Sequence, residues 1–277
     1  FDRSGNTLWE LLLPPESYAW GYSVGDLDGD GKQEVITITW EEVHEKIVGD
    51  DSKWGCAGSY SLLILNNLGE EKLKRSIGCE FDVQEVIALG DINGDGNKEI
   101  IVSFQGAYPD PGHIYAFDKN GNKLFTKEIT IVSDSPSLAD INNDGILEIY
   151  SSIVETYKDI NNKAVFVFKV AFYNKKGNEL NNWPKRIPNV AHKGVIGDLD
   201  GDGKQEIITT MRNYKFIGGI GWSELIILNN GGVIILNSDG TIREKKIPIY
   251  DVNSLSMGDL DKNGKTELFS YVDGRLY

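Results

Sequence analysis

Five stretches of this chain place aspartate or asparagine at every second position of a short loop that ends in glutamate. The fourth stretch begins at Asp198 and reads Asp-Leu-Asp-Gly-Asp-Gly-Lys-Gln-Glu, with carboxylates at positions 1, 3, 5 and 9. Hard divalent cations such as calcium require about six to eight oxygen ligands, and alternating carboxylates around a glycine turn supply many of them. The spacing therefore predicts a calcium site in each loop.

A comparison of the five copies indicates a role for each loop position. Positions 1, 3 and 5 are always Asp or Asn, and position 6 is always glycine, which adopts positive φ without strain. Position 7 varies from Lys to Asn to Ile, so its backbone carbonyl is the expected ligand, and the invariant Glu at position 9 is expected to close the site with both oxygens. The predicted ligands of up to five Ca²⁺ ions are Asp26, Asp28, Asp30, Lys32 and Glu34; Asp91, Asn93, Asp95, Asn97 and Glu99; Asp140, Asn142, Asp144, Ile146 and Glu148; Asp198, Asp200, Asp202, Lys204 and Glu206; and Asp259, Asp261, Asn263, Lys265 and Glu267.

Two other interpretations of these loops, an EF-hand and a solvated turn, fit the sequence less well. An EF-hand requires Glu at position 12 between two helices, whereas position 12 here is Thr, Val or Ser and the flanks are strand-like. Solvated Asp-Gly turns would not require the same glutamate in every copy. Because charge count tunes calcium affinity, the Asp26 and Asp198 loops, with four carboxylates each, are expected to bind most tightly.

The composition agrees with a metal-binding protein. The chain has 277 residues and a formal charge of −14, and five calcium ions would cancel most of that charge. The acidity gives no support to nucleic-acid binding. No apolar run is long enough for membrane insertion, no signal peptide is recognisable, and the start at Phe1 suggests a mature or excised product.

The two cysteines, Cys56 and Cys79, flank a predicted hairpin formed by residues 60–65 and 72–77. They are predicted to form a cross-strand disulfide, which suits an extracellular or cell-surface location. The alternative is that they are two small buried hydrophobic residues.

The loops start 65, 49, 58 and 61 residues apart, intervals typical of propellers or solenoids. A short apolar strand precedes each loop, a β-rich segment such as 35–40, 100–104 or 207–211 follows it, and a hairpin with a glycine turn comes next. Asn120-Gly121 and Asp239-Gly240 indicate type I′ turns, and Asn229-Asn230-Gly231-Gly232 suggests an inserted hairpin. The pattern predicts an all-β fold, a single β-propeller domain over 1–277 with five antiparallel four-stranded blades.

The two ends of the chain predict closure of a ring. Residues 274–277 and then 1–5 together match the segment 112–121, with one residue missing at the join. One blade is therefore expected to be split between the termini and closed by pairing of the N- and C-terminal strands, which removes exposed edges. The alternative is an excerpt of a longer array.

The five DxDxDGxxE-type loops and their neighbouring strands resemble FG-GAP/VCBS repeats, the blades of integrin α-chains and of many microbial surface proteins. The resemblance covers nearly the whole chain. It implies that each calcium loop joins the first and second strands of a blade and binds metal through positions 1, 3, 5, 7 and 9. The chain has five repeats rather than seven and little of the Phe-Gly…Gly-Ala-Pro signature, so it does not imply integrin-like ligand binding.

The loops opposite the calcium sites are expected to vary and to bind the ligand, since large loops on rigid scaffolds carry function. Exposed aromatic rings there could stack on sugars or anchor a protein, although such rings also pack beneath loops. The candidate ligand-binding residues are Trp20, Trp40, Trp54, Tyr108, Tyr157, Tyr214 and Trp222.

Two functions fit these features. The favoured one is a non-enzymatic extracellular module for adhesion or surface assembly, which binds a protein or glycan. The alternative is a carbohydrate-active enzyme such as a polysaccharide lyase, or a glycan-binding lectin; some relatives of this propeller type are lyases. A lyase needs a base beside a cation, and the histidines His44, His113 and His192 each lack a spaced partner or a nucleophile motif.

Overall fold

The computed structural model describes residues 3–42, 58–78, 87–105, 111–130, 135–158, 160, 164–187, 190–216, 225–246, 252–262, 266–272 and 275–276. Every regular element in these ranges is a β-strand. No helix in this part of the chain is long and apolar enough to cross a membrane. The all-β prediction is confirmed.

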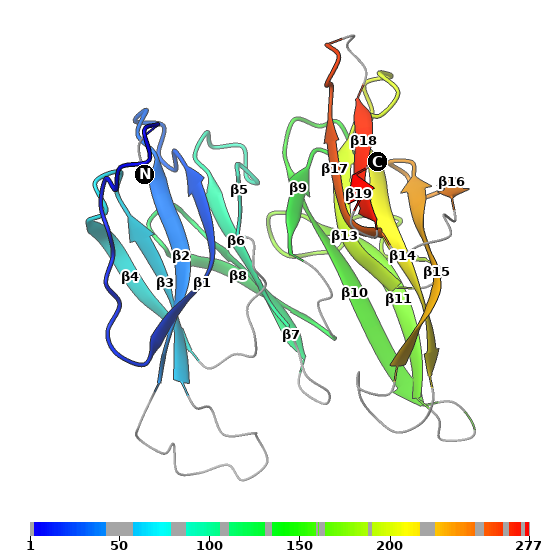
Figure 1. The fold of residues 1–277 in the computed structure, drawn as a ribbon, viewed down its shortest axis with the longest axis horizontal. Coiled ribbons are helices and arrows are strands. Elements are labelled where there is room, and N and C mark those ends of the chain that lie inside the picture. Colours follow the sequence, from blue (N-terminus) through cyan, green and yellow to red (C-terminus); the bar gives the residue numbers. More distant parts are fainter. Residues whose placement is uncertain are drawn as a thin grey trace.

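The strands form five sheets, named A to E in chain order (Figure 1). Sheet A contains β1 (Ser17–Gly25), β2 (Glu34–Glu42), β3 (Gly58–Leu65) and β4 (Glu71–Gly78), and sheet B contains β5 (Ala88–Gly90), β6 (Glu99–Phe104), β7 (Gly112–Phe117) and β8 (Lys123–Ile129). Sheet C contains β9 (Ser137–Ala139), β10 (Glu148–Lys158), β11 (Ala164–Tyr173) and β12 (Lys185–Arg186). Sheet D contains β13 (Val190–Gly197), β14 (Glu206–Phe216), β15 (Leu225–Leu236) and β16 (Ile242–Lys246), and sheet E contains β17 (Val252–Gly258), β18 (Glu267–Val272) and β19 (Arg275–Leu276).

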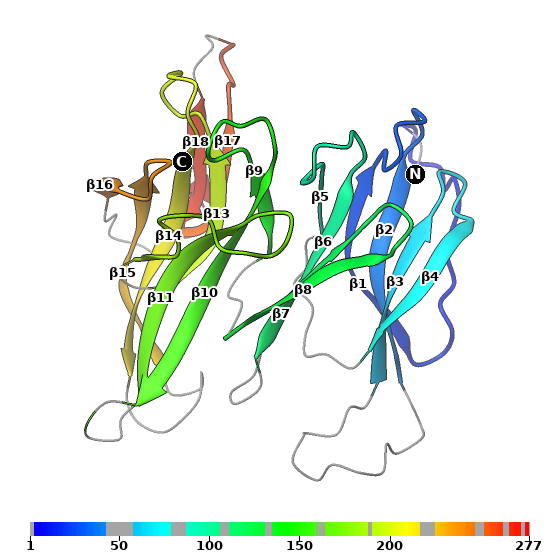
Figure 2. The ribbon, with the colours of Figure 1, turned by 180° about the vertical axis from the view of Figure 1, so that it is seen from behind.

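Each sheet is an antiparallel meander with the same register at its first turn. The last residue of the first strand pairs with the glutamate at loop position 9, as in Gly25 with Glu34 and Gly90 with Glu99. The predicted loops therefore join the first and second strands in all five sheets. Figure 2 shows the same succession of sheets from behind.

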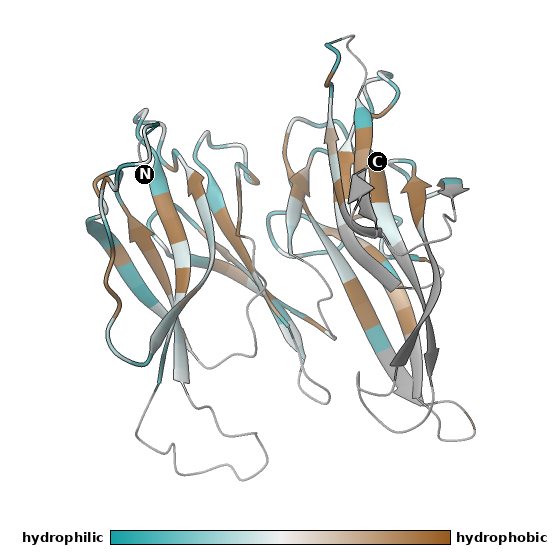
Figure 3. Cartoon of the chain, in the orientation of Figure 1, coloured by the Kyte–Doolittle hydropathy of each residue, from teal (hydrophilic) through white to brown (hydrophobic). Residues whose placement is uncertain are grey.

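The hydrophobic core lies between neighbouring sheets. One cluster joins sheets A and B, a second joins B and C, and a third joins C and D. β6 is buried at every residue because sheets pack against both of its faces. Figure 3 shows hydrophobic residues along the strands and hydrophilic residues at the loops.

Small residues at the end of the first strand let adjacent sheets approach. A Cβ added to Gly25 would lie 2.8 Å from Leu89 Cδ1 of sheet B, and one added to Gly90 would lie 2.6 Å from Leu138 Cδ1 of sheet C. Gly197 receives Met257 of sheet E in the same way. The equivalent glycine of sheet E, Gly258, faces open space.

A second recurring contact lies at the hairpin turn between the third and fourth strands. In each case a side chain from the preceding sheet covers the turn glycine: Leu73 of β4 covers Gly121, Phe125 of β8 covers Gly177, and Lys185 of β12 covers Gly240. Trp9 covers Gly69 of sheet A. The N-terminal segment thus lies where the fourth strand of a preceding sheet would lie.

Two sequence predictions need correction in the described residues. The hairpin turns are not type I′, because Gly121 and Gly240 have positive φ but Asn120 and Asp239 do not. The Gly121 N–H donates to Asp118 O (2.9 Å) and the Asp118 N–H to Asn122 O (2.9 Å), a type I turn with a glycine bulge. Carboxylate oxygen Oδ1 of Asp118 accepts the Asn120 and Asn122 N–H groups and so stabilises that turn.

The predicted inserted hairpin at 229–232 is also absent. β15 runs continuously from Leu225 to Leu236, and the residues between Leu228 and Gly232 form a bulge against β14. Backbone pairing continues on both sides of the bulge, so the glycines lie in a bulge within one continuous strand and do not reverse the direction of the chain.

The predicted pairing of the terminal strands stays a prediction, because most of the residues that would pair lie outside the described part of the chain. Sheet E has three described strands, and β19 pairs with β18 alone among them. The two chain ends lie in different halves of the molecule (Figure 1). Instead, the segment that includes Trp9 packs on sheet A through Gly69. Phe1, Asp2 and Tyr277 lie outside the described residues.

Candidate metal-binding loops

The loops lie at one end of their sheets, the upper end in Figure 1. In each, the glutamate at position 9 begins the second strand and reaches back across the loop. One carboxylate oxygen, Oε2, accepts the backbone N–H of position 2 in all five loops, at 2.9–3.1 Å: Leu27 to Glu34, Ile92 to Glu99, Ile141 to Glu148, Leu199 to Glu206 and Leu260 to Glu267.

This contact fixes the orientation of the glutamate. Oε2 accepts the backbone N–H with one lone pair, so both carboxylate oxygens keep acceptor capacity for an ion. Glu34, Glu99, Glu148 and Glu206 are all at most 3 % exposed. A buried carboxylate needs a partner of opposite charge or a hydrogen-bond donor.

The aspartate at position 1 organises the turn of the loop. In the Asp198 loop, Gly201 N donates to Oδ1 (2.7 Å) and Gly203 N donates to Oδ2 (2.8 Å). The Gly203 hydrogen bond, against the effect of burial, holds the pKa of Asp198 below its ordinary value. Gly203 has a φ of 85°, which brings its N–H into the loop at no steric cost.

Three of the loops bring carboxylate oxygens together tightly. Ligand oxygens of positions 1, 3 and 9 lie within 4.8 Å of one another in the Asp26, Asp198 and Asp259 loops. Two oxygens bound to one calcium ion at about 2.4 Å can be at most about twice that distance apart. These three acidic clusters could hold a metal ion, and their hard oxygen donors fit calcium.

The side chains at position 7 differ in their contacts. Those of Lys32 and Lys204 are 65 % and 63 % exposed, and their Nζ atoms lie 3.6 and 3.8 Å from the position 5 carboxylates of Asp30 and Asp202. Ile146 contacts Gly94 of the neighbouring loop, and Asn97 donates to Asp95 Oδ1. Asn263 and Lys265 lie outside the described residues.

The Asp91 and Asp140 loops carry asparagine at position 3. Asn93 Nδ2 donates to Glu99 Oε1 at 2.8 Å, and Asn142 Nδ2 donates to Glu148 Oε1 at 3.1 Å. Burial, together with the nearby aspartates, raises the pKa of Glu99 and of Glu148 to about 7. These two glutamates therefore hold a proton readily when no metal is bound.

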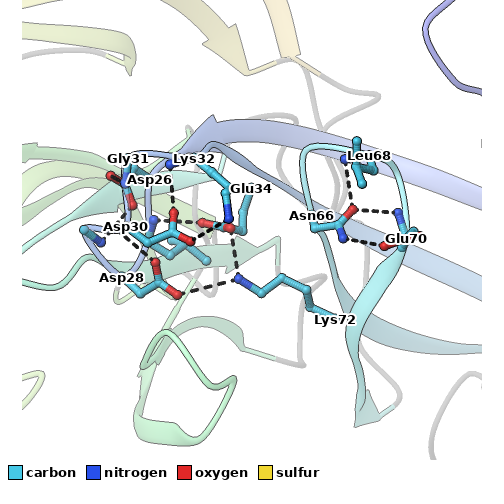
Figure 4. Close-up of polar contacts among 12 residues, drawn as sticks. Asp26, Asp28, Asp30, Gly31, Lys32, Glu34, Asn66, Leu68, Glu70 and Lys72 are labelled. Atoms are coloured by element: carbon cyan, nitrogen blue, oxygen red, sulfur yellow. Dashed lines mark hydrogen bonds and ion pairs between the residues drawn. The ribbon is translucent and has the colours of Figure 1, made fainter.

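In the Asp26 and Asp198 loops a cation from the fourth strand of the same sheet reaches the glutamate. Lys72 Nζ lies 2.9 Å from Glu34 Oε1 and 3.6 Å from Asp28 Oδ2 (Figure 4). Arg243 Nη2 lies 2.8 Å from Asp200 Oδ2, and its Nη1 lies 3.5 Å from Glu206 Oε1. Sequence reasoning missed both cations, because they are 38 and 37 residues from the glutamates they contact.

The structure gathers part of the predicted aromatic set on sheet A. Trp20 is 44 % exposed, and Trp40 is half-buried with its ring 5.6 Å from that of Tyr18. Tyr157 lies on β10 and Tyr214 on β14, and their side chains lie outside the described part. Trp54, Tyr108, Trp222, Cys56 and Cys79 fall outside the described residues.

Comparison with known proteins agrees with this repeated architecture. Residues 91–151 match the FG-GAP-like repeat family. The chain contains an FG-GAP-like repeat. This FG-GAP-like repeat begins at Asp91, the first residue of the second loop, covers β6, β7 and β8 of sheet B and includes the Asp140 loop. No curated protein matches the sequence.

Two solved structures share the fold of the protein. The rhamnogalacturonan lyase YesW matches with a TM-score of 0.57 and 17 % identity over 92 % of this chain and 47 % of its own. The exotype rhamnogalacturonan lyase YesX matches with a TM-score of 0.53 and 17 % identity over 92 % of this chain and 45 % of its own. The chain spans about half the length of each, and the likeness shows a propeller-like fold.

Proposed function

We propose that this protein is an extracellular binding module in which calcium stabilises each sheet at its first turn. The observation that carries the proposal is the repeated loop, in which the position 9 glutamate accepts the position 2 N–H in all five copies and is buried in four of them. A bound ion would lie among positions 1, 3, 5, 7 and 9 and would neutralise carboxylates that otherwise repel one another.

Calcium binding can be tested by its effect on unfolding. An ion that binds only the folded protein stabilises it by mass action. The melting temperature should fall in excess chelator and recover when calcium is added, and calorimetry should count up to five ions. An unchanged melting temperature in chelator would contradict the role of all five sites.

We place the ligand surface on the side of sheet A that faces sheet B. Tyr18 pairs with Trp40 and Trp20 pairs with Ile38, so these four side chains project from the same side of the sheet. Tyr18 lies near the end of β1 that is opposite the calcium loop. Tyr18 and Trp20 are 57 % and 44 % exposed. Aromatic rings of this kind stack on sugars or anchor a protein partner.

A matched pair of variants tests this surface. Trp20→Ala should abolish binding in a glycan array or a partner pull-down while leaving stabilisation by calcium intact. Tyr22→Ala is the control: Tyr22 is 76 % exposed, but it follows a bulge and pairs with Thr37, so it projects from the other side of the sheet. Equal loss of binding in both variants would remove the assignment.

A polysaccharide lyase is the second candidate function. The shared fold with two rhamnogalacturonan lyases favours it. Incubation with rhamnogalacturonan or pectic polymers should then release an unsaturated product, measured by its ultraviolet absorbance, in a calcium-dependent manner. Binding to a polymer without such release would support the binding module.

We also propose that the five sheets close into a five-bladed ring outside the cell, with Cys56 and Cys79 joined as a disulfide. Val24 precedes Gly25 as Leu89 precedes Gly90 and Met257 precedes Gly258, and it is 55 % exposed. Gly258 has open space where such a side chain would fit. The first and last sheets therefore carry complementary halves of the contact that joins the other sheets.

A further inference from the structure

Three of the sheets carry a β-bulge at the same place, just after the hairpin turn into the fourth strand. The turns are equivalent, because Gly69, Gly121 and Gly240 each donate their N–H to the residue three before them, at 3.0, 2.9 and 2.8 Å. Three residues after each glycine, the register with the third strand shifts. The residues left without a direct pairing partner are Lys72, Leu124 and Arg243.

A β-bulge redirects the side chain of its extra residue. In sheets A and D, this residue is the cation that reaches the metal-binding loop, Lys72 or Arg243. In sheet B the residue is Leu124, which is 45 % exposed. In sheet C, Leu180 stands at the same distance from its turn glycine, Gly177.

The residue at this bulge position varies together with loop position 3 of the same sheet. Where position 3 is aspartate, as in Asp28 and Asp200, the bulge residue is a cation. Where position 3 is asparagine, as in Asn93 and Asn142, the corresponding residue is leucine. The fourth carboxylate of a loop is therefore accompanied by a positive charge from strand four.

The shared target is one oxygen of the buried glutamate. Lys72 Nζ is 2.9 Å from Glu34 Oε1, and Arg243 Nη1 is 3.5 Å from Glu206 Oε1. In the asparagine loops the same oxygen accepts an amide hydrogen from Asn93 or Asn142. An amide can turn its oxygen toward an ion, whereas an ammonium or guanidinium has no acceptor and must withdraw.

We propose that Lys72 and Arg243 are built-in counter-cations that compete with calcium for the ligands at positions 3 and 9 of their loops. The inference rests on the proposed calcium function. It reduces the advantage expected from counting carboxylates, because the Asp26 and Asp198 sites bind calcium less tightly than their four carboxylates alone would give. It also keeps sheets A and D neutralised and folded when calcium is scarce.

The test replaces the cation with the residue that nature uses in sheet B. Lys72→Leu should raise the calcium affinity of one site by about tenfold, because a positive charge within about 4 Å of a divalent ion is removed. Calorimetric titration measures the affinity. In chelator the variant should melt at a lower temperature than the wild type, and its rise on calcium addition should be larger.

Lys74→Leu is the matched control. Lys74 lies on the same strand, but its Nζ pairs with Glu41 and does not reach a loop. This variant loses the same charge and should leave calcium affinity unchanged. A role for Lys72 in packing alone would lower the melting temperature equally with and without calcium, which would overturn the proposal.

A double variant converts the loop of sheet A to the combination found in sheet B. Asp28→Asn with Lys72→Leu should return the affinity toward the wild-type value, because charge and counter-charge are removed together. Arg243→Leu repeats the test in sheet D, so the result does not depend on the folding of one variant.

Two further results would overturn the proposal. One is an unchanged or lower calcium affinity in both Lys72→Leu and Arg243→Leu. The other is a gain in Lys74→Leu as large as that in Lys72→Leu. If the wild type and every variant fail to bind calcium, the calcium function itself is wrong and the counter-cation role falls with it; this outcome is distinguished by flat calorimetric titrations throughout.

Discussion

The glutamate at loop position 9 is the residue on which each site depends, because it holds both ends of the loop together and is buried in four of the five loops. Glu99→Gln keeps the size of the side chain and the Ile92 hydrogen bond but removes the charge. In calcium at about 100 times the dissociation constant, the variant should lose about 2–3 kcal/mol of stabilisation. In chelator it should be as stable as the wild type or more so. Melting curves with and without calcium measure both effects, and equal loss in both conditions would contradict this role.

The same glutamates predict how stability depends on pH without calcium. Burial raises the pKa of Glu99 and of Glu148 to about 7 in the folded protein, above the ordinary value of 4.5. Between those values the folded state binds more protons than the unfolded state, so stability falls as pH rises through this window. In chelator, the melting temperature should be higher at about pH 5.5 than at about pH 7. Glu99→Gln should flatten the slope, and a rise in stability with pH over this range would count against it.

At the scale of strands and turns, the packing of one sheet on the next depends on turn glycines. Gly121 has a φ of 67°, and an added Cβ would lie 2.2 Å from Leu73 Cδ2. Gly121→Ala should cost about 1–2 kcal/mol for the left-handed backbone and about 1–3 kcal/mol more for overpacking. Gly5→Ala is the control, because Gly5 has a φ of 83° but open space around it. Denaturant unfolding measures both, and equal losses would show that the Leu73 contact is unimportant.

The sequence predicted those elements whose signal is local and repeated. The loops, the strands that flank them and the hairpin at residues 60–77 follow from alternation and glycine placement within a few residues. The type of turn did not, because the side chain of Asp118 selects it by accepting two backbone N–H groups. The link from Lys72 to Glu34 requires the pairing of β2, β3 and β4 and a one-residue bulge, which no single stretch of sequence reveals.

For the whole molecule, the decisive question is whether sheets A and E meet in solution. Val24→Cys combined with Gly258→Cys places one thiol on each of the two complementary faces. If the ring closes, mild oxidation should give an intramolecular disulfide, seen as a monomer that migrates faster without reductant. Leu124→Cys with Gly258→Cys is the control. Leu124 lies on β8 of sheet B, which does not face Gly258 in a closed ring, so this pair should give no intramolecular disulfide. Exclusive formation of disulfide-linked oligomers would show that these faces meet between chains.

The contacts at the first-strand glycines also predict which sheets unfold locally most often. Sheets B and C have core clusters on both sides, and sheet D has one against sheet C and the Met257 contact with sheet E, whereas Gly258 of sheet E faces open space and Val24 of sheet A is exposed. In arrays with nearest-neighbour energetics, local unfolding starts at the units with one neighbour. While the ring is open, amide hydrogens of β6 and β10 should therefore exchange with solvent more slowly than those of β18, and closure should remove this difference. Each loop glutamate ties the first strand of its own sheet to the second, so calcium should slow exchange sheet by sheet, whereas ring closure should protect sheets A and E in particular.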